Sequence, residues 1–141
     1  MSVENANSVP VEAGSMYDWI GGEPVVRGLV DRFYDLMDSE GNDDEHIAKL
    51  RAMHQTDLSP MRQSLFEYLS GWLGGPPLYI EKHGSPCLTG PHAKFEIDMA
   101  ARDAWLQCMD TAILETGIDE QYRLQLMPAF QRIADMLVNQ P

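Results

Sequence analysis

Residues 89–97 read Thr89-Gly90-Pro91-His92-Ala93-Lys94-Phe95-Glu96-Ile97, and residues 101–109 follow as Ala101-Arg102-Asp103-Ala104-Trp105-Leu106-Gln107-Cys108-Met109. The first stretch places a single histidine in a segment punctuated by glycine and proline, which disfavour helix. The second predicts an amphipathic helix in which Trp105 and Met109, four residues apart, share one face. A lone imidazole next to an apolar helix face suits a flat, apolar ligand with a metal at its centre.

The composition predicts one folded domain that does not bind polyanions. A chain of 141 residues is long enough to bury a sizeable core and to enclose a cofactor. Its 22 acidic and 10 basic residues give a formal net charge of −12, which repels nucleic-acid phosphates and anionic membrane surfaces. Because 44% of the residues are hydrophobic and recur periodically, the acidity does not indicate disorder.

The N-terminal residues carry no targeting signal. Residues 1–15 lack both a basic start and an apolar centre, so we predict a flexible tail there and a domain over residues 16–141. No apolar run reaches the roughly 20 residues that a membrane span requires. Two cysteines, Cys87 and Cys108, are too few for a secreted disulfide scaffold, and buried thiols are favoured although a bridge stays open. We therefore expect a reduced, cytoplasmic protein without membrane contact.

The first half of the domain reads as three helices. Gly21-Gly22 precedes Glu23-Pro24, which opens a helix of about four turns with Val26, Val30, Phe33 and Met37 on one face. Residues 43–53 predict a shorter helix with His54 at its exit. Ser59 is the predicted N-cap of the next helix, which Gly74-Gly75-Pro76-Pro77 ends.

The second half predicts a long loop followed by two helices. Residues 78–97 lose periodicity, so we expect an ordered loop with at most a turn or two of helix around His92. Asp98 can cap a helix that runs to about Thr116. The last helix spans residues 119–139, where Pro128 should kink or divide it. No segment has the alternation of a strand, and no internal repeat is present.

Several of these residues, taken in order, resemble the group II truncated haemoglobins. They are the pairs Gly21-Gly22 and Gly74-Gly75, then Phe33-Tyr34, Trp72, His92 and Trp105, and the resemblance spans roughly residues 17–139. It implies an all-α fold, a two-over-two helical sandwich around a haem b and its iron. The glycine pairs suit this fold because glycine tolerates positive φ at helix junctions, where the helices cross closely.

On this resemblance, His92 is the proximal ligand of the haem iron. Neutral imidazole is a strong axial donor. Phe95, with Ile97, could form a wall of the haem slot, and Lys94 could bind a propionate. Relatives commonly carry a basic residue where this chain has Pro91. The propionate contact therefore falls to Lys94 or Arg102, or the propionate faces water.

The resemblance also implies which residues lie on the distal side of the haem, where the gas binds. Dioxygen gains partial negative charge when it binds ferrous haem, so hydrogen-bond donors slow its release. Tyr34 and Trp105 match the family's distal tyrosine and tryptophan, and His54 takes a position that is aromatic or histidine in this group. Further residues would line the pocket: Met61, Leu65 and Tyr68 along the distal helix, and Phe33 and Met109 at its depth.

Two haem functions compete, and a third class stays open. A reversible binder of dioxygen or another diatomic gas needs only His92, Tyr34 and Trp105. A haem-dependent redox enzyme, of the peroxidase or nitric oxide dioxygenase type, would also need a reductant or a partner reductase. The chain has no Gly-x-Gly-x-x-Gly motif and no room for a flavin domain.

The third class is a helical interaction or sensor module without haem. The four histidines of the chain (His46, His54, His83 and His92) are too dispersed in the sequence for the signature of a metal site. A further hypothesis concerns coordination: His54 or Tyr34 could bind the iron when no gas is present. The oligomeric state is left open by the sequence.

Overall fold

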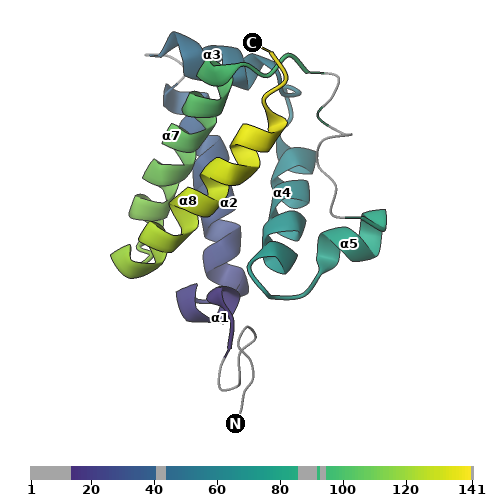
Figure 1. The fold of residues 1–141 in the computed structure, drawn as a ribbon, viewed down its shortest axis with the longest axis vertical. Coiled ribbons are helices and arrows are strands. Elements are labelled where there is room, and N and C mark those ends of the chain that lie inside the picture. The colour runs from purple at the N-terminus through teal and green to yellow at the C-terminus, as the bar shows by residue number, and fades with distance from the viewer. Residues whose placement is uncertain (1–13, 41–43, 86–91, 93–94, 141) are drawn as a thin grey trace.

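The computed structural model describes residues 14–40, 44–85, 92 and 95–140. The described residues form seven helices (Figure 1): α1 (Met16–Ile20), α2 (Glu23–Glu40), α3 (Glu45–Ala52), α4 (Ser59–Trp72), α5 (Leu78–His83), α7 (Met99–Thr116) and α8 (Glu120–Leu137). The predicted tail falls, apart from its last two residues, outside the described ranges. Cys87 lies outside them too, and Cys108 is buried.

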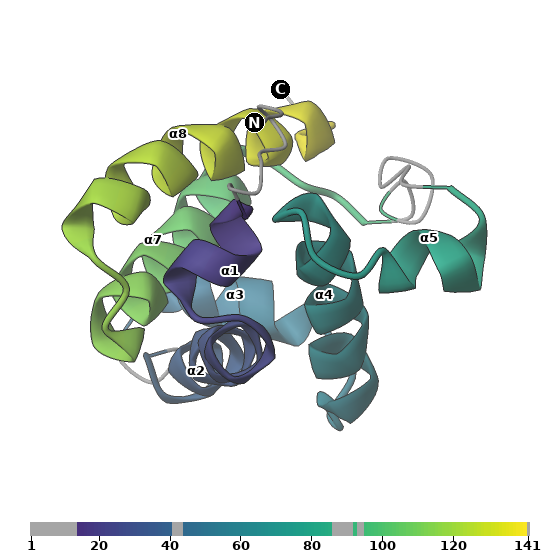
Figure 2. The same ribbon diagram turned by 90° about the horizontal axis from the view of Figure 1, so that it is seen from below.

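Two helix pairs, α2 with α4 and α7 with α8, form the body of the domain. Helix α2 packs against α4 and α7, α7 packs against α8, and α3 contacts both α2 and α7. Figure 2 shows α7 and α8 on one side of the molecule and α4 on the other, with α5 beyond α4. The all-α class predicted from the sequence is therefore correct. None of the described helices has the length and apolar composition needed to cross a membrane.

The core follows the predicted helical periodicity of α2. Val26, Val30, Phe33 and Met37 are at most 1% exposed, so this face of α2 lies at the centre of the domain. Burying an apolar side chain of this size contributes about 1.5–3 kcal/mol. The fully buried residues of α7 and α8, Met109, Ile113 and Phe130, belong to the same core.

Helix ends agree with the sequence in two cases and differ in one. The Asp98 carboxylate accepts a hydrogen bond from the Ala101 amide at 2.8 Å, and Gly117, with φ at 86°, ends α7. The prediction that Ser59 is the N-cap of α4 is wrong. Ser59 is the first helical residue, and its amide donates to the Asp57 carboxylate at 2.9 Å.

One other expectation is corrected, and one of the two outcomes expected at Pro128 is excluded. The segment after Gly75 contains a full helix, α5, where the sequence predicts only loop, because a six-residue helix is too short to show periodicity. Helix α8 is not divided at Pro128 and continues through it. Pro128 and Leu124, whose carbonyl would otherwise receive the missing amide, are both exposed, so water can bind that carbonyl.

The second glycine pair has two distinct roles at the end of α4. Gly74 has φ at 96°, as the sequence predicts for a helix junction. Gly75 is not in the positive-φ region, and an added Cβ would lie 2.5 Å from the Tyr17 ring. Gly75 therefore allows close approach of α1 to the end of α4, and the Tyr17 amide donates to the Leu73 carbonyl at 2.9 Å.

Candidate functional site

Tyr34 is a buried hydrogen-bond donor on α2. Its ring lies 4.9 Å from that of Phe33 between centroids, and its side chain is in the core with only 6% of the residue exposed. Burial raises the pKa of the phenol to about 12, against a smaller opposite effect of the Arg62 charge. Tyr34 therefore keeps its proton at neutral pH. Its hydroxyl makes no hydrogen bond to any residue that the structure describes, although such bonds normally satisfy buried hydroxyls.

Trp105 presents a second donor, on α7. Its ring lies edge-on between Phe33, at 5.2 Å, and Phe130, at 5.7 Å. Phe33 thus contacts both donor-bearing rings. The indole N–H can only donate, and within the described ranges it has no hydrogen-bond partner. One turn further along α7, Met109 is fully buried, as expected for the depth of a pocket.

His54 has a defined tautomer. Its Nδ1 lies 2.9 Å from the Leu50 carbonyl oxygen, which can only accept, so Nδ1 carries the proton and Nε2 keeps its lone pair. Burial lowers the pKa of His54, the hydrogen bond to Leu50 opposes this, and the charges of Arg51 and His92 lower it further. The imidazole is therefore neutral at pH 7, with Nε2 able to accept a proton or bind a metal.

His92 lies in the same neighbourhood as His54, since the two imidazoles interact electrostatically. It is half-buried, and its carbonyl accepts a hydrogen bond from the Phe95 amide at 3.1 Å. Phe95 is also half-buried. Lys94, the predicted propionate partner, lies outside the described residues. The structure thus brings the predicted proximal and distal histidines together, although they are 38 positions apart (92 minus 54).

The predicted pocket face of α4 is apolar but only half-buried. Met61, Leu65 and Tyr68 pack against the core from this helix without being enclosed by it. The Tyr68 ring also meets Tyr79 of α5 edge-on at 5.6 Å. Such a face offers apolar surface that a flat macrocycle could cover.

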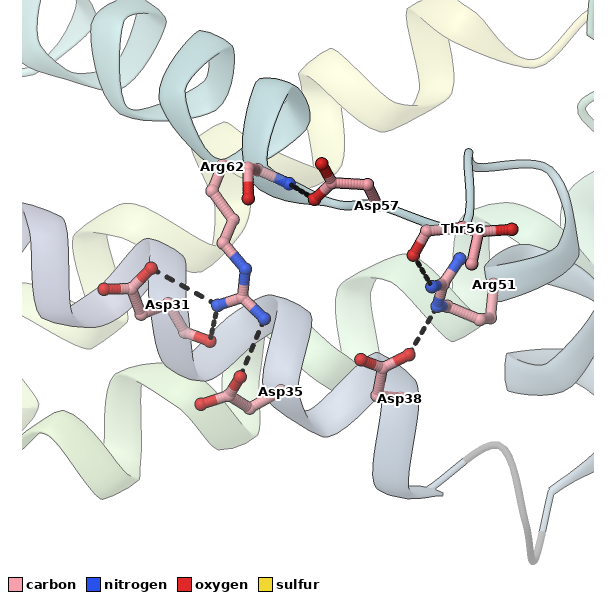
Figure 3. A network of polar contacts seen from close by, with 8 residues as sticks. Asp31, Asp35, Asp38, Arg51, Thr56, Asp57 and Arg62 are labelled. Carbon is pink, nitrogen blue, oxygen red and sulfur yellow. Dashed lines mark hydrogen bonds and ion pairs between the residues drawn. The ribbon is translucent and has the colours of Figure 1, made fainter.

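Arg51 and Arg62 make polar contacts with α2, and Arg51 also binds the loop that precedes α4 (Figure 3). Arg51 pairs with Asp38 of α2 and donates to the Gln55 and Thr56 carbonyls at 3.0 and 2.9 Å. Arg62 of α4 bridges to the α2 residues Asp31 and Asp35, at 3.3 and 2.8 Å. The Arg62 guanidinium also lies 5.8 Å from the centre of the Tyr34 ring.

The sequence did not identify these arginines or Phe130 as parts of the site. Phe130 belongs to the spacing Leu126, Phe130, Ala134, all buried, which a search for helical periodicity could have found. No sequence signal marks Arg51 or Arg62, because their partners are fixed only by the tertiary fold. They position the site residues from outside it.

The residues present fit a haem. An imidazole, a half-buried apolar surface and two donors without partners in the described residues are the groups that a haem with a gaseous ligand requires. Arg102, one alternative for the propionate, donates to Asp135 at 2.6 Å and to Asp103 at 2.9 Å. Its guanidinium is thus already engaged by carboxylates.

Known proteins agree with this assignment. The family model for the bacterial-like globins matches residues 15–139. The group 2 truncated haemoglobin YjbI of Bacillus subtilis is 34% identical over 119 residues, which cover 84% of this chain and 85% of that protein.

Solved structures of group II truncated haemoglobins have the same fold. That of Agrobacterium tumefaciens superposes with a TM-score of 0.86 at 39% identity, covering 94% of this chain and 99% of the other. The cold-adapted truncated haemoglobin of Pseudoalteromonas haloplanktis TAC125 gives 0.84 at 38% identity, covering 91% and 100%. The expected two-over-two architecture is thus confirmed, and the chain belongs to the bacterial-like globin family, among the group II truncated haemoglobins.

Proposed function

We propose that this globin binds dioxygen, and other diatomic gases, reversibly at the iron of a haem b held by His92. The observation that carries the proposal is the pair of donors, Tyr34 and Trp105, which lack hydrogen-bond partners among the described residues and both contact Phe33. When bound, the haem supplies the metal site for the gas. The two donors would stabilise partial negative charge on the ligand and slow its release.

The remaining predicted residues would hold the macrocycle. Met61, Leu65, Tyr68 and Phe95 offer half-buried apolar surface, and the buried Phe33 and Met109 would close the deeper end. Lys94 would bind a propionate through a charge-assisted hydrogen bond. The family favours this haem protein over a helical module without a cofactor. The cytoplasmic location stays a prediction.

The resting protein could also use a residue of its own as sixth ligand. His54 suits this better than Tyr34, because its Nε2 has a free lone pair while Nδ1 is held by Leu50. Tyr34 would first have to lose a proton that burial retains up to a pKa of about 12. A ferric spectrum that is five-coordinate or water-bound at every accessible pH would exclude both residues.

A redox enzyme is the second candidate function. The neutral His54 could accept a proton from a peroxide, as a general base does, so the observation that favours a peroxidase is the tautomer set by Leu50. This function, like nitric oxide dioxygenation, would require an electron donor. A basic reductase would be attracted by the formal net charge of −12.

The first experiment is the visible spectrum of the purified protein: oxidised, reduced, and reduced under carbon monoxide. A haem spectrum that shifts with carbon monoxide and is lost or altered in His92→Ala supports the proposal, with His83→Ala of α5 as the control histidine variant. A protein that neither contains haem nor takes up haemin contradicts it. Steady turnover with peroxide, or with nitric oxide and an electron donor, would favour the enzyme over the reversible binder.

A further inference from the structure

The end of the chain is tied to the segment that follows His92. We propose that Asn139 is a positioning residue for His92, acting through residues 95–97. The inference rests on the proposed role of His92 as iron ligand and assigns a task to a residue far from it in sequence. Figure 1 shows the yellow C-terminal end beside the green segment that leads into α7.

The carboxamide of Asn139 binds two backbone groups of this segment. Its Nδ2 donates to the Phe95 carbonyl at 2.8 Å, and its Oδ1 accepts from the Ile97 amide at 2.8 Å. The backbone amides of Asn139 and Gln140 donate to the Ile97 carbonyl at 2.8 and 3.1 Å. A carboxamide carries a donor and an acceptor side by side on one planar group, so Asn139 can serve the Phe95 carbonyl and the Ile97 amide at the same time.

Phe95 connects this contact to His92. Its amide donates to the His92 carbonyl at 3.1 Å, and its carbonyl is the one that Asn139 holds. The backbone of Phe95 is therefore fixed at one end by the residue that bears the imidazole and at the other by Asn139.

Helices α7 and α8, which flank residues 95–97 and Asn139 in the chain, are joined by an ion pair. Arg102 of α7 is paired with Asp135 of α8 at 2.6 Å, so the start of α7 and the end of α8 are held together. Asp98, the N-cap of α7, directly follows Ile97. Both side-chain hydrogen bonds between the C-terminal end and residues 95–97 come from the carboxamide of Asn139.

The consequence concerns the orientation of the proximal imidazole. Residues that hold a metal ligand from outside commonly change metal affinity by about 10–100-fold when they are removed. If Asn139 is lost, the segment 95–97 keeps its backbone bonds to residues 139 and 140 but loses the hold on the Phe95 carbonyl. His92 should then sample more orientations, bind iron more weakly and release haem faster.

The test compares Asn139→Ala and Asn139→Asp with Gln140→Ala, each as the full chain, loaded with haem for the first two measurements and free of haem for the third. Three measurements are made: the rate of haem transfer to an apomyoglobin scavenger, the iron–histidine stretching band of the ferrous protein, and amide exchange at Ile97 without haem. Asn139→Ala should speed haem loss about tenfold or more, broaden or shift the band, and speed exchange. Asn139→Asp keeps the acceptor for Ile97 but sets a carboxylate oxygen against the Phe95 carbonyl oxygen, which repels it, so this variant should lose haem at least as fast as Asn139→Ala. Gln140→Ala retains its backbone bond and loses only the 3.4 Å contact of its side-chain amide with Asn139 Oδ1, so it should match the parent.

Three results would overturn the inference. Faster exchange at Ile97 with an unchanged haem-loss rate and band would mean that Asn139 holds the segment without acting on His92. Unchanged exchange in Asn139→Ala would mean that the contact does not constrain the segment. A parent protein whose haem spectrum does not depend on His92 would overturn the proposed function as well, and is recognised by the His92→Ala spectrum alone. The band separates positioning from general stability, because a merely looser fold does not shift it.

Discussion

The imidazole of His54 meets the phenol ring of Tyr34 edge-on, with centroids 5.9 Å apart and planes inclined at 77°. The Tyr34 ring is thus contacted by Phe33 on α2 and by His54 after α3, and its hydroxyl has no hydrogen bond to the described residues. The contacts fix the ring while leaving the O–H available to a ligand. Because burial keeps the phenol protonated, with a pKa of about 12, the donor is present throughout the physiological range.

Tyr34→Phe should raise the rate of dioxygen dissociation. It keeps the ring contacts with Phe33 and His54 and removes only the hydroxyl. A hydrogen bond to a charged group is worth about 1.5–3 kcal/mol, which corresponds to roughly 10–100-fold in rate. The measurement is stopped-flow displacement of dioxygen, with Tyr122→Phe on α8 as a matched control. A dissociation rate equal to that of the parent would remove Tyr34 from the proposed mechanism.

Trp105→Phe tests the second donor. Phenylalanine preserves an aromatic ring between Phe33 and Phe130 and deletes the indole N–H. We expect dioxygen release to become faster by roughly tenfold, with a smaller effect on carbon monoxide, which gains less negative charge. Trp19→Phe, at a residue 49% exposed on α1, serves as the control. If Tyr34 and Trp105 bind one ligand atom together, the double variant will not show the sum of the two single effects. Simple additivity would mean that they act separately.

His54 should make the folded protein less stable toward acid. Burial lowers its pKa in the folded state, so the unfolded chain binds more protons between that value and the ordinary pKa of about 6.5. The free energy of unfolding should therefore fall as pH drops below about 6.5, by up to about 1.4 kcal/mol per pH unit for this one group. In His54→Gln that part of the slope should vanish, whereas His46→Gln, at an exposed residue of α3, should retain it. Urea unfolding of the haem-free protein at several pH values gives the slopes, and identical slopes in His54→Gln and the parent would count against the assignment.

The sequence predicts the long helices of this fold because their apolar faces recur over several turns. Val26, Val30, Phe33 and Met37 already define the buried face of α2, and Asp98 marks the start of α7. Short elements escape this reasoning. Helix α5, with six residues, has fewer than two turns in which a period could appear. At the start of α4, the N-cap is Leu58 and the Asp57 carboxylate accepts from the Ser59 amide, an arrangement that the Ser59-Pro60 pair does not indicate.

The site is predictable to the extent that it depends on residue chemistry. The family resemblance predicts Tyr34, Trp105 and His54 as site residues. In the structure, Phe33 contacts the rings of Tyr34 and Trp105. The Tyr34 ring in turn contacts the His54 imidazole. Arg51 and Asn139 could not be predicted, because both act on backbone carbonyls that only the folded chain brings near them. Neither the composition nor the spacing of residues indicates which carbonyls these two side chains bind.

Gly75→Ala tests the close approach of α1 to the end of α4. The new Cβ would lie 2.5 Å from the rigid Tyr17 ring, so α1 or the turn after α4 must shift. Overpacking of this kind costs about 1–3 kcal/mol in the free energy of unfolding. Gly28→Ala is the matched control: nothing lies within 4 Å of its added Cβ on the exposed side of α2, and alanine should stabilise the helix by about 1 kcal/mol. Denaturant midpoints should therefore move in opposite directions for the two variants. If Gly75→Ala is as stable as the parent, the junction is less tightly packed than the Tyr17 contact indicates.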